Sequence, residues 1–149
     1  MTTKGADRAV VDTNVLLAAT DEGRAEHTHA VALINEWPAA GTVLYTSGQI
    51  LREYLVVATR AVKHNGLGLA PRDAVANVRA LRARLRPLTE SSKVSERLLE
   101  LLDQIDCAGK QVHDANVVAT MLVHGIDTVV TINRKDFLRF GNDVRVVSP

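Results

Sequence analysis

Acidic and amide side chains follow two predicted strands of the chain, where they could act together on one substrate. Asp12 directly follows the β-branched run AVV at positions 9–11, which we interpret as the first strand. Asn133 comes just after a similar run at 128–132, and Asp136 follows in the next turn. Side chains at the carboxyl ends of parallel strands meet at one edge of a sheet, where ligands bind. An Asp at a strand end also occurs as a plain turn or cap residue, so Asp12 by itself fits either role.

Asp114 carries more information because of the helix face on which it falls. In a helix predicted over 112–124, the face it occupies is apolar and carries Val117, Val118, Met121 and Leu122. Burying a carboxylate without a partner is costly. Interaction with the helix N-terminus would explain an acid in the first turn, but not its place on the inward face. Asp114 therefore indicates a functional carboxylate.

Glu53 lies at the border of the apolar side of a long helix predicted from 46 to about 64. Thr46 and Gln49 have the spacing of a capping box at its start. A surface ion pair with Arg52 or Arg60 would account for Glu53, and helix geometry by itself favours that interpretation.

The sequence does not indicate catalysis or metal binding by cysteine or histidine side chains. The single cysteine, Cys107, excludes an intramolecular disulfide and a Cys-rich metal site, and it has no obvious base beside it. The five histidines lack metal-ligand spacing, and His113 falls towards the polar side of its helix. A site built from carboxylate oxygens alone suits Mg²⁺ or Mn²⁺.

Short apolar runs alternate with helical patterns along the chain. We predict strands at 9–11, 42–45, 128–132 and 144–147, with a very short one at 87–88. Helices are predicted at 14–20, 25–37, 46–64, from 71 to about 86, around 94–105, and at 112–124. This alternation implies parallel pairing and an α/β sandwich, with helices covering both faces of the sheet.

Composition and charge limit the class of protein. The chain has 149 residues, which fits one domain, and its 46% hydrophobic fraction supports a core built mainly of aliphatic side chains. No stretch resembles a signal peptide or a membrane span, so we expect a soluble cytosolic protein. Eight Arg or Lys residues against two acids lie between 52 and 86. This stretch could face a polyanion, although charge alone favours a solvated helix face.

Four stretches together resemble the PIN domain, the nuclease fold of VapC-type toxins from bacterial toxin–antitoxin pairs. They are VVDTNVLL at 10–17, TSGQILRE at 46–53, HDANVVAT at 113–120 and VVTINRKDF at 129–137. Each is weak alone, but their order and spacing extend over nearly the whole chain.

The resemblance implies a three-layer α/β sandwich with a short, mainly parallel sheet, forming a single nuclease domain over 1–149. It implies a site of four acids, namely Asp12, Glu53, Asp114 and Asp136. Many members have Asp where this chain has Asn133, so Asp136 either supplies the fourth carboxylate or only orients the site. Asn14 and Thr131 resemble the family's supporting polar residues, and Asn133 could still bind water or metal.

The resemblance also implies an activity and partners. We expect a cytoplasmic ribonuclease that hydrolyses RNA phosphodiester bonds with Mg²⁺ or Mn²⁺, with Asp12 and Asp114 as central ligands. Glu53 would hold a second metal or the water. We expect a homodimer and a cognate VapB-like antitoxin that blocks the acidic site. Helix faces around Tyr54 and Leu98 are candidate interfaces, and the arginines between 72 and 86 could guide the RNA backbone.

Other classes fit less well. A haloacid-dehalogenase-like phosphatase needs a second Asp two residues after the first, where this chain has Asn14. A receiver-like domain needs an acidic pair that does not accompany Asp12. A catalytically weak PIN-like module that binds RNA or protein stays open, because Asn133 departs from the commoner pattern.

Overall fold

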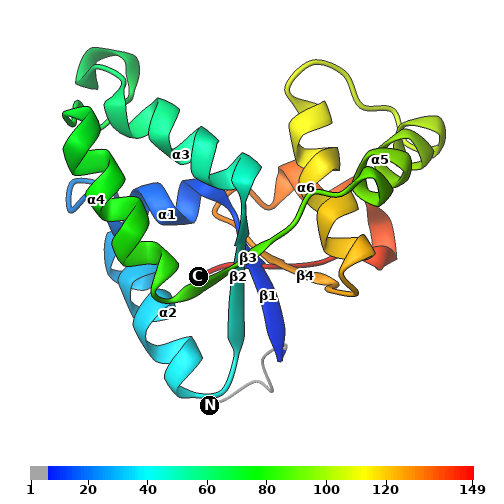
Figure 1. The fold of residues 1–149 in the computed structure, drawn as a ribbon, viewed down its shortest axis with the longest axis horizontal. Coiled ribbons are helices and arrows are strands. Elements are labelled where there is room, and N and C mark those ends of the chain that lie inside the picture. Colours follow the sequence, from blue (N-terminus) through cyan, green and yellow to red (C-terminus); the bar gives the residue numbers. More distant parts are fainter. Residues whose placement is uncertain (1–6) are drawn as a thin grey trace.

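The fold is known from a computed structural model that describes residues 7–149. Its centre is a five-stranded parallel sheet in the order β3-β2-β1-β4-β5 (Figure 1). The strands are β1 (Arg8–Val11), β2 (Val43–Ser47), β3 (Leu85–Leu88), β4 (Thr128–Val130) and β5 (Arg145–Val147). The predicted parallel α/β sandwich is confirmed, and the sheet is parallel throughout.

Helices cover both sides of this sheet, so its strands can be continuously apolar. Figure 1 shows α1 to α4 gathered on one side and α5 and α6 on the other. The helices are α1 (Thr13–Ala19), α2 (His27–Ala39), α3 (Gly48–Thr59), α4 (Pro71–Arg82), α5 (Ser92–Gln104), α6 (Gln111–Val123) and α7 (Lys135–Leu138), with 3₁₀ turns η1 (Val62–His64) and η2 (Gly141–Asp143). Each helix in residues 7–149 is too short or too polar to cross a membrane.

The central strand β1 brings its carboxyl end between β2 and β4. Val10 is in register with Tyr45 on one side and with Val129 on the other. The Asp12 backbone N–H, one residue past the strand, donates to the Val130 carbonyl at 2.9 Å. Asp12 is therefore fixed at the middle of the sheet edge.

The structure corrects two boundaries predicted from the sequence. The helix from Pro71 ends at Arg82, and Leu85 to Leu88 instead form β3, paired with β2. Strand pairing thus overrides a helical pattern that continues to Leu85. The expected Thr46–Gln49 capping box is absent. Ser47 is the N-cap of α3, and its hydroxyl accepts from the Ile50 N–H.

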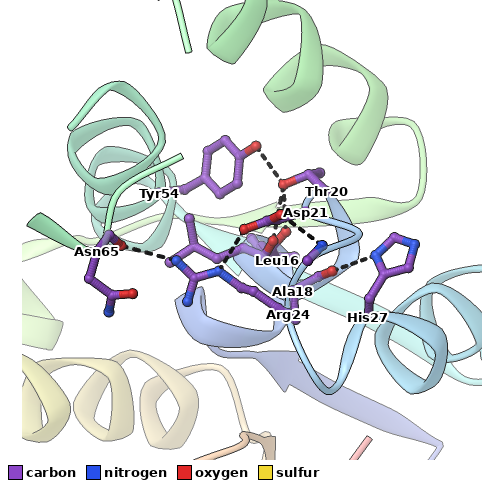
Figure 2. A network of polar contacts seen from close by, with 10 residues as sticks. Leu16, Ala18, Thr20, Asp21, Arg24, His27, Tyr54 and Asn65 are labelled. Carbon is purple, nitrogen blue, oxygen red and sulfur yellow. Dashed lines mark hydrogen bonds and ion pairs between the residues drawn. The ribbon is translucent and has the colours of Figure 1, made fainter. Parts of the chain in front are cut away.

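Helix α3 is tied to its neighbours by a polar network around Tyr54 (Figure 2). The buried Tyr54 hydroxyl lies 2.8 Å from the Thr20 hydroxyl and accepts a hydrogen bond from the Asn77 amide at 3.0 Å. Arg24 pairs with Asp21 and donates to the Asn65 carbonyl. Together these contacts hold α1, α3 and α4 in one arrangement.

The burial of Tyr54 contradicts part of the expectation that helix faces around Tyr54 and Leu98 form interfaces with partners. Tyr54 is 0% exposed, so its side chain lies in the core and cannot form an interface. Leu98 is partly buried against the core. The large apolar side chains that do reach the surface are Val56, Val62, Leu99 and Leu138.

Candidate active site

Asp12 is placed by the end of β1 and held by two hydrogen bonds. As the N-cap of α1, its Oδ1 accepts from the Thr13 N–H at 2.8 Å. Its Oδ2 accepts from the Thr131 hydroxyl, also at 2.8 Å. Burial raises the pKa of Asp12 from 3.8 to about 6, and these two hydrogen bonds oppose that rise. Asp12 is therefore a buried, oriented carboxyl that titrates close to neutrality.

Asn14 and Thr131 lie beside Asp12, where the resemblance placed them. The Asn14 amide donates to the Thr131 hydroxyl at 3.1 Å, and its oxygen accepts from the Ile132 N–H at 3.2 Å. The Asn133 backbone N–H also donates to the Thr131 hydroxyl, at 3.2 Å. The Asn133 side chain is exposed, so this residue reaches the network through its backbone.

Glu53 faces this network across the junction of α1 and α3. Its Oε2 accepts from the Thr13 hydroxyl at 2.9 Å and its Oε1 accepts from the Gln49 amide at 2.8 Å. Within residues 7–149 neither Arg52 nor Arg60 forms an ion pair with it. The surface ion pair that helix geometry favoured is thus wrong, and Glu53 belongs to the acidic site.

Gln49 is a part of the site that the sequence analysis assigned to a cap. The side chain is 5% exposed. Its Nε2 donates to Glu53 and to the His113 carbonyl at 2.9 Å, and its Oε1 accepts from the Asn116 amide at 2.7 Å. Its position one helical turn before Glu53 was the available signal, because residues i and i+4 share a face.

Asp114 enters from α6 and is half-buried. Its pKa is raised to about 7, first by burial and then by repulsion from Asp12, Asp136 and Glu53. Asp136, in the first turn of α7, is also half-buried and raises the pKa of Asp12. The four predicted acids therefore lie within reach of one another's charge.

Helix α6, which carries Asp114, also buries polar residues. Thr120 is 2% exposed, and its hydroxyl donates to the Asn116 carbonyl. Asn116 itself points to Gln49 and Glu90. The helix is buried around most of its circumference, so the single polar stripe expected from its sequence does not exist.

Arg139, which no sequence motif singled out, places a positive charge near Asp114. It lowers the pKa of Asp114, although less than burial and the acids raise it. Its Nε is buried and has no hydrogen-bond partner within the described part of the chain. Arg139 follows Asp136 by three residues, a spacing that brings side chains together on a helical turn.

The donor chemistry of the site fits a hard divalent cation. Carboxylate, hydroxyl and amide oxygens are the ligands that Mg²⁺ and Mn²⁺ prefer. The pKa values of Asp12 and Asp114 are raised first by burial and then by the negative charge of neighbouring acids, which a cation would offset. Across residues 7–149, no three His, Cys, Asp or Glu side chains stand close enough to form a ready-made metal site. The fit of the site to a divalent cation therefore rests on the type of its donor atoms and on its negative charge.

The basic residues near the end of α4 lie away from the acids. Arg82, Arg84 and Arg86 line a cavity of about 410 Å³ together with Val43 and Leu44. Val43 begins β2, whereas the acids gather where β1 and β4 end. These arginines thus lie near the amino-terminal ends of the strands, opposite to the carboxyl ends where the acids lie. This position weakens the expectation that they guide RNA to the site.

Comparison with known proteins places this arrangement in a family. The PIN domain family model matches residues 9–142. Ribonuclease VapC48 of Mycobacterium tuberculosis is 30% identical over 140 residues, covering 93% of this chain and 94% of the relative. The M. tuberculosis toxin VapC20, which cleaves the sarcin-ricin loop, is 27% identical with a TM-score of 0.57, covering 81% of this chain and 86% of VapC20. VapBC2 of Rickettsia felis shares the fold, with a TM-score of 0.71, 16% identity, and coverage of 95% and 98%.

Proposed function

The chain belongs to the PIN-domain family, and from this premise we propose that it is a metal-dependent ribonuclease toxin neutralised by a cognate antitoxin. It hydrolyses RNA phosphodiester bonds at the acidic site. The observation that carries the assignment is the convergence of these acids at one place: besides burial, Glu53 and Asp136 raise the pKa of Asp12, and Asp12, Asp136 and Glu53 raise the pKa of Asp114. These residues come from four separate segments of the chain, and a chance surface would not raise two carboxyl pKa values in this way.

We propose that Asp12 and Asp114 hold Mg²⁺ or Mn²⁺, with Glu53 and Asp136 completing the set. A divalent ion at such a site activates water and stabilises charge on the phosphate during in-line displacement. The positive charge of the bound cation would also reduce the repulsion among the acids, which otherwise favours their protonation.

The protein's own groups orient these acids. The hydroxyl of Thr131 and the N–H of Thr13 fix both oxygens of Asp12 and favour its ionised form. The hydroxyl of Thr13 and the amide of Gln49 fix both oxygens of Glu53. Such prior orientation reduces the cost of arranging charged groups around the reacting phosphate.

Partners and location follow from the same proposal. The antitoxin would be VapB-like and would cover the acidic edge, and the toxin would form a homodimer in the cytoplasm. We propose one nuclease domain over residues 1–149. Size-exclusion chromatography with light scattering tests the homodimer, and copurification with the protein encoded beside it tests the antitoxin.

Cleavage of labelled RNA by the purified chain tests the function. We expect cutting with Mg²⁺ or Mn²⁺, none with EDTA, and a loss on the order of a thousandfold in Asp12→Asn. Asp127→Asn is the matched control, because Asp127 is an exposed acid that bonds only its neighbour Thr128. Cutting that survives both EDTA and Asp12→Asn would exclude the metal mechanism.

The same assay addresses a catalytically weak PIN-like binding module. The exposed side chain of Asn133, where many family members carry an acid, is the observation that favours this alternative. Wild-type protein that binds RNA or antitoxin but cuts no RNA with either metal would support it.

A further inference from the structure

The Gln49 side chain, which binds one oxygen of Glu53, also contacts the helix that carries Asp114. It is almost fully buried, at 5% exposure, in the first turn of α3. A buried amide needs hydrogen-bond partners for both its N–H groups and its oxygen. All of its partners belong to the acidic site or to the segments that carry it.

The two N–H groups of Gln49 reach two different acid-bearing segments. One donates to Glu53 Oε1 at 2.8 Å and the other to the carbonyl of His113 at 2.9 Å. His113 directly precedes Asp114 in α6. A single planar amide thus sets the separation between the Glu53 carboxylate and the backbone that carries Asp114.

The orientation of this amide is itself determined. Its oxygen accepts from the Asn116 amide at 2.7 Å, so Nε2 must face Glu53 and His113. Asn116 also donates to Glu90 at 3.3 Å, and the other oxygen of Glu90 accepts from the Gln49 backbone N–H at 3.1 Å. This loop of hydrogen bonds joins α3, α6 and the segment before α5, with Gln49 buried at its centre and Glu90 exposed at its outer side, and such connected bonds hold the Gln49 amide in one geometry.

We propose that Gln49 is the positioning residue of the acidic site, which orients Glu53 and fixes α6, and hence Asp114, relative to it. The inference rests on the proposed function in so far as these acids bind a cation. Gln49 touches neither RNA nor metal in this assignment. It acts through Glu53 and through the helix of Asp114.

The test is Mn²⁺ binding by calorimetry, together with RNA cleavage kinetics. Gln49→Met keeps a side chain of similar length and removes both donors. We expect a tenfold to hundredfold loss of Mn²⁺ affinity, about the range found for residues that orient metal ligands. We also expect kcat to fall while KM for RNA changes little, because Gln49 does not contact the substrate. Gln111→Met, which removes another glutamine at the start of α6, serves as the matched control.

A double-mutant cycle separates positioning from a purely structural role. In a Glu53→Ala background, Gln49→Met should weaken Mn²⁺ binding by less than in wild type, because the part of its effect that passes through the contact with Glu53 is already lost. Gln49→Leu, which also lacks both donors and adds no charge or metal ligand, is the second variant should Gln49→Met fold poorly. Equal losses in both backgrounds, or unchanged Mn²⁺ affinity with only a lowered Tm, would overturn the proposal.

Failure of the function and failure of this inference give different results. If wild-type protein binds Mn²⁺ in a Gln49-dependent way but cuts no RNA, the ribonuclease proposal fails and the positioning role stands. If wild type cuts RNA and Gln49→Met leaves both kcat and Mn²⁺ affinity within twofold of wild type, the positioning role is wrong and the function stands.

Discussion

The hydroxyl of Thr131 donates a hydrogen bond of 2.8 Å to the carboxylate of Asp12, across a sequence separation of 119 residues. This contact joins the ends of two neighbouring strands and lowers the pKa of Asp12 against the effect of burial. Its loss should therefore change the pH at which the site works.

Thr131→Val should shift the acidic limb of the cleavage profile upwards by about one pH unit. A hydrogen bond to a charged group contributes about 1.5 kcal/mol or more, and one pKa unit corresponds to about 1.4 kcal/mol. Rates of RNA cleavage measured from acidic to alkaline pH give the shift. Thr128→Val is the control, because Thr128, at the start of β4, is as deeply buried as Thr131 but its hydroxyl bonds only Asp127. An unshifted profile in Thr131→Val would contradict the prediction.

The metal-free protein should lose stability as pH rises towards neutrality. The folded-state pKa is about 6 for Asp12 and about 7 for Asp114, both above the ordinary value of 3.8. Folding therefore favours their protonated forms, and this stabilisation is complete below about pH 4 and is lost as pH rises through 6 to 7. Urea unfolding in EDTA should show Asp12→Asn more stable than wild type above pH 7, by about 1–3 kcal/mol. This difference in the free energy of unfolding between Asp12→Asn and wild type should disappear at low pH. A gap that does not depend on pH would show that the charge of Asp12 is not its cause.

Mg²⁺ or Mn²⁺ should raise the Tm of the wild-type protein. A cation that binds only the folded state stabilises it by about 2.7 kcal/mol at a concentration a hundred times its Kd. Differential scanning fluorimetry with increasing Mn²⁺ measures the effect. Asp114→Asn should reduce the rise strongly, whereas Asp127→Asn should leave it intact. Equal rises in all three proteins would place the cation elsewhere.

Asp136 should matter more for cleavage than Asn133. Asp136 is half-buried and acts on the pKa of both Asp12 and Asp114, whereas the Asn133 side chain is exposed and joins the network only through its backbone. We expect Asp136→Asn to lower kcat about tenfold or more and Asn133→Ala to change it less than about threefold. The reverse order would assign the fourth position to Asn133.

Tyr54→Phe should lower stability without removing activity. The hydroxyl lies against that of Thr20, the C-cap of α1 (Figure 2). It also accepts from Asn77 on α4, so its loss leaves two polar groups short of a partner. We expect a loss of about 1–3 kcal/mol in the free energy of unfolding. Urea unfolding measures it, and cleavage by the folded protein should stay within a few-fold of wild type. Abolished cleavage in a fully folded variant would indicate that Tyr54 acts on Glu53 directly.

The sequence by itself determined which strand ends and which helix carry acids. Asp12 follows a β-branched run, and Asp114 falls on an apolar helix face, so local periodicity was enough to single them out. The alternation of strands and helices likewise determined the parallel sheet, because parallel neighbours require crossover connections.

Tertiary structure decided the rest. Helix periodicity could not tell whether Glu53 at the border of α3 faces solvent or the acids, because the answer depends on Thr13 and on the distant His113 backbone that aligns Gln49. The sequence pattern indicated β3 only in part, at 87–88, because the rest of this short edge strand exists only through its pairing with β2. Contacts between residues far apart in the chain set side-chain direction and strand pairing, and local patterns do not record them.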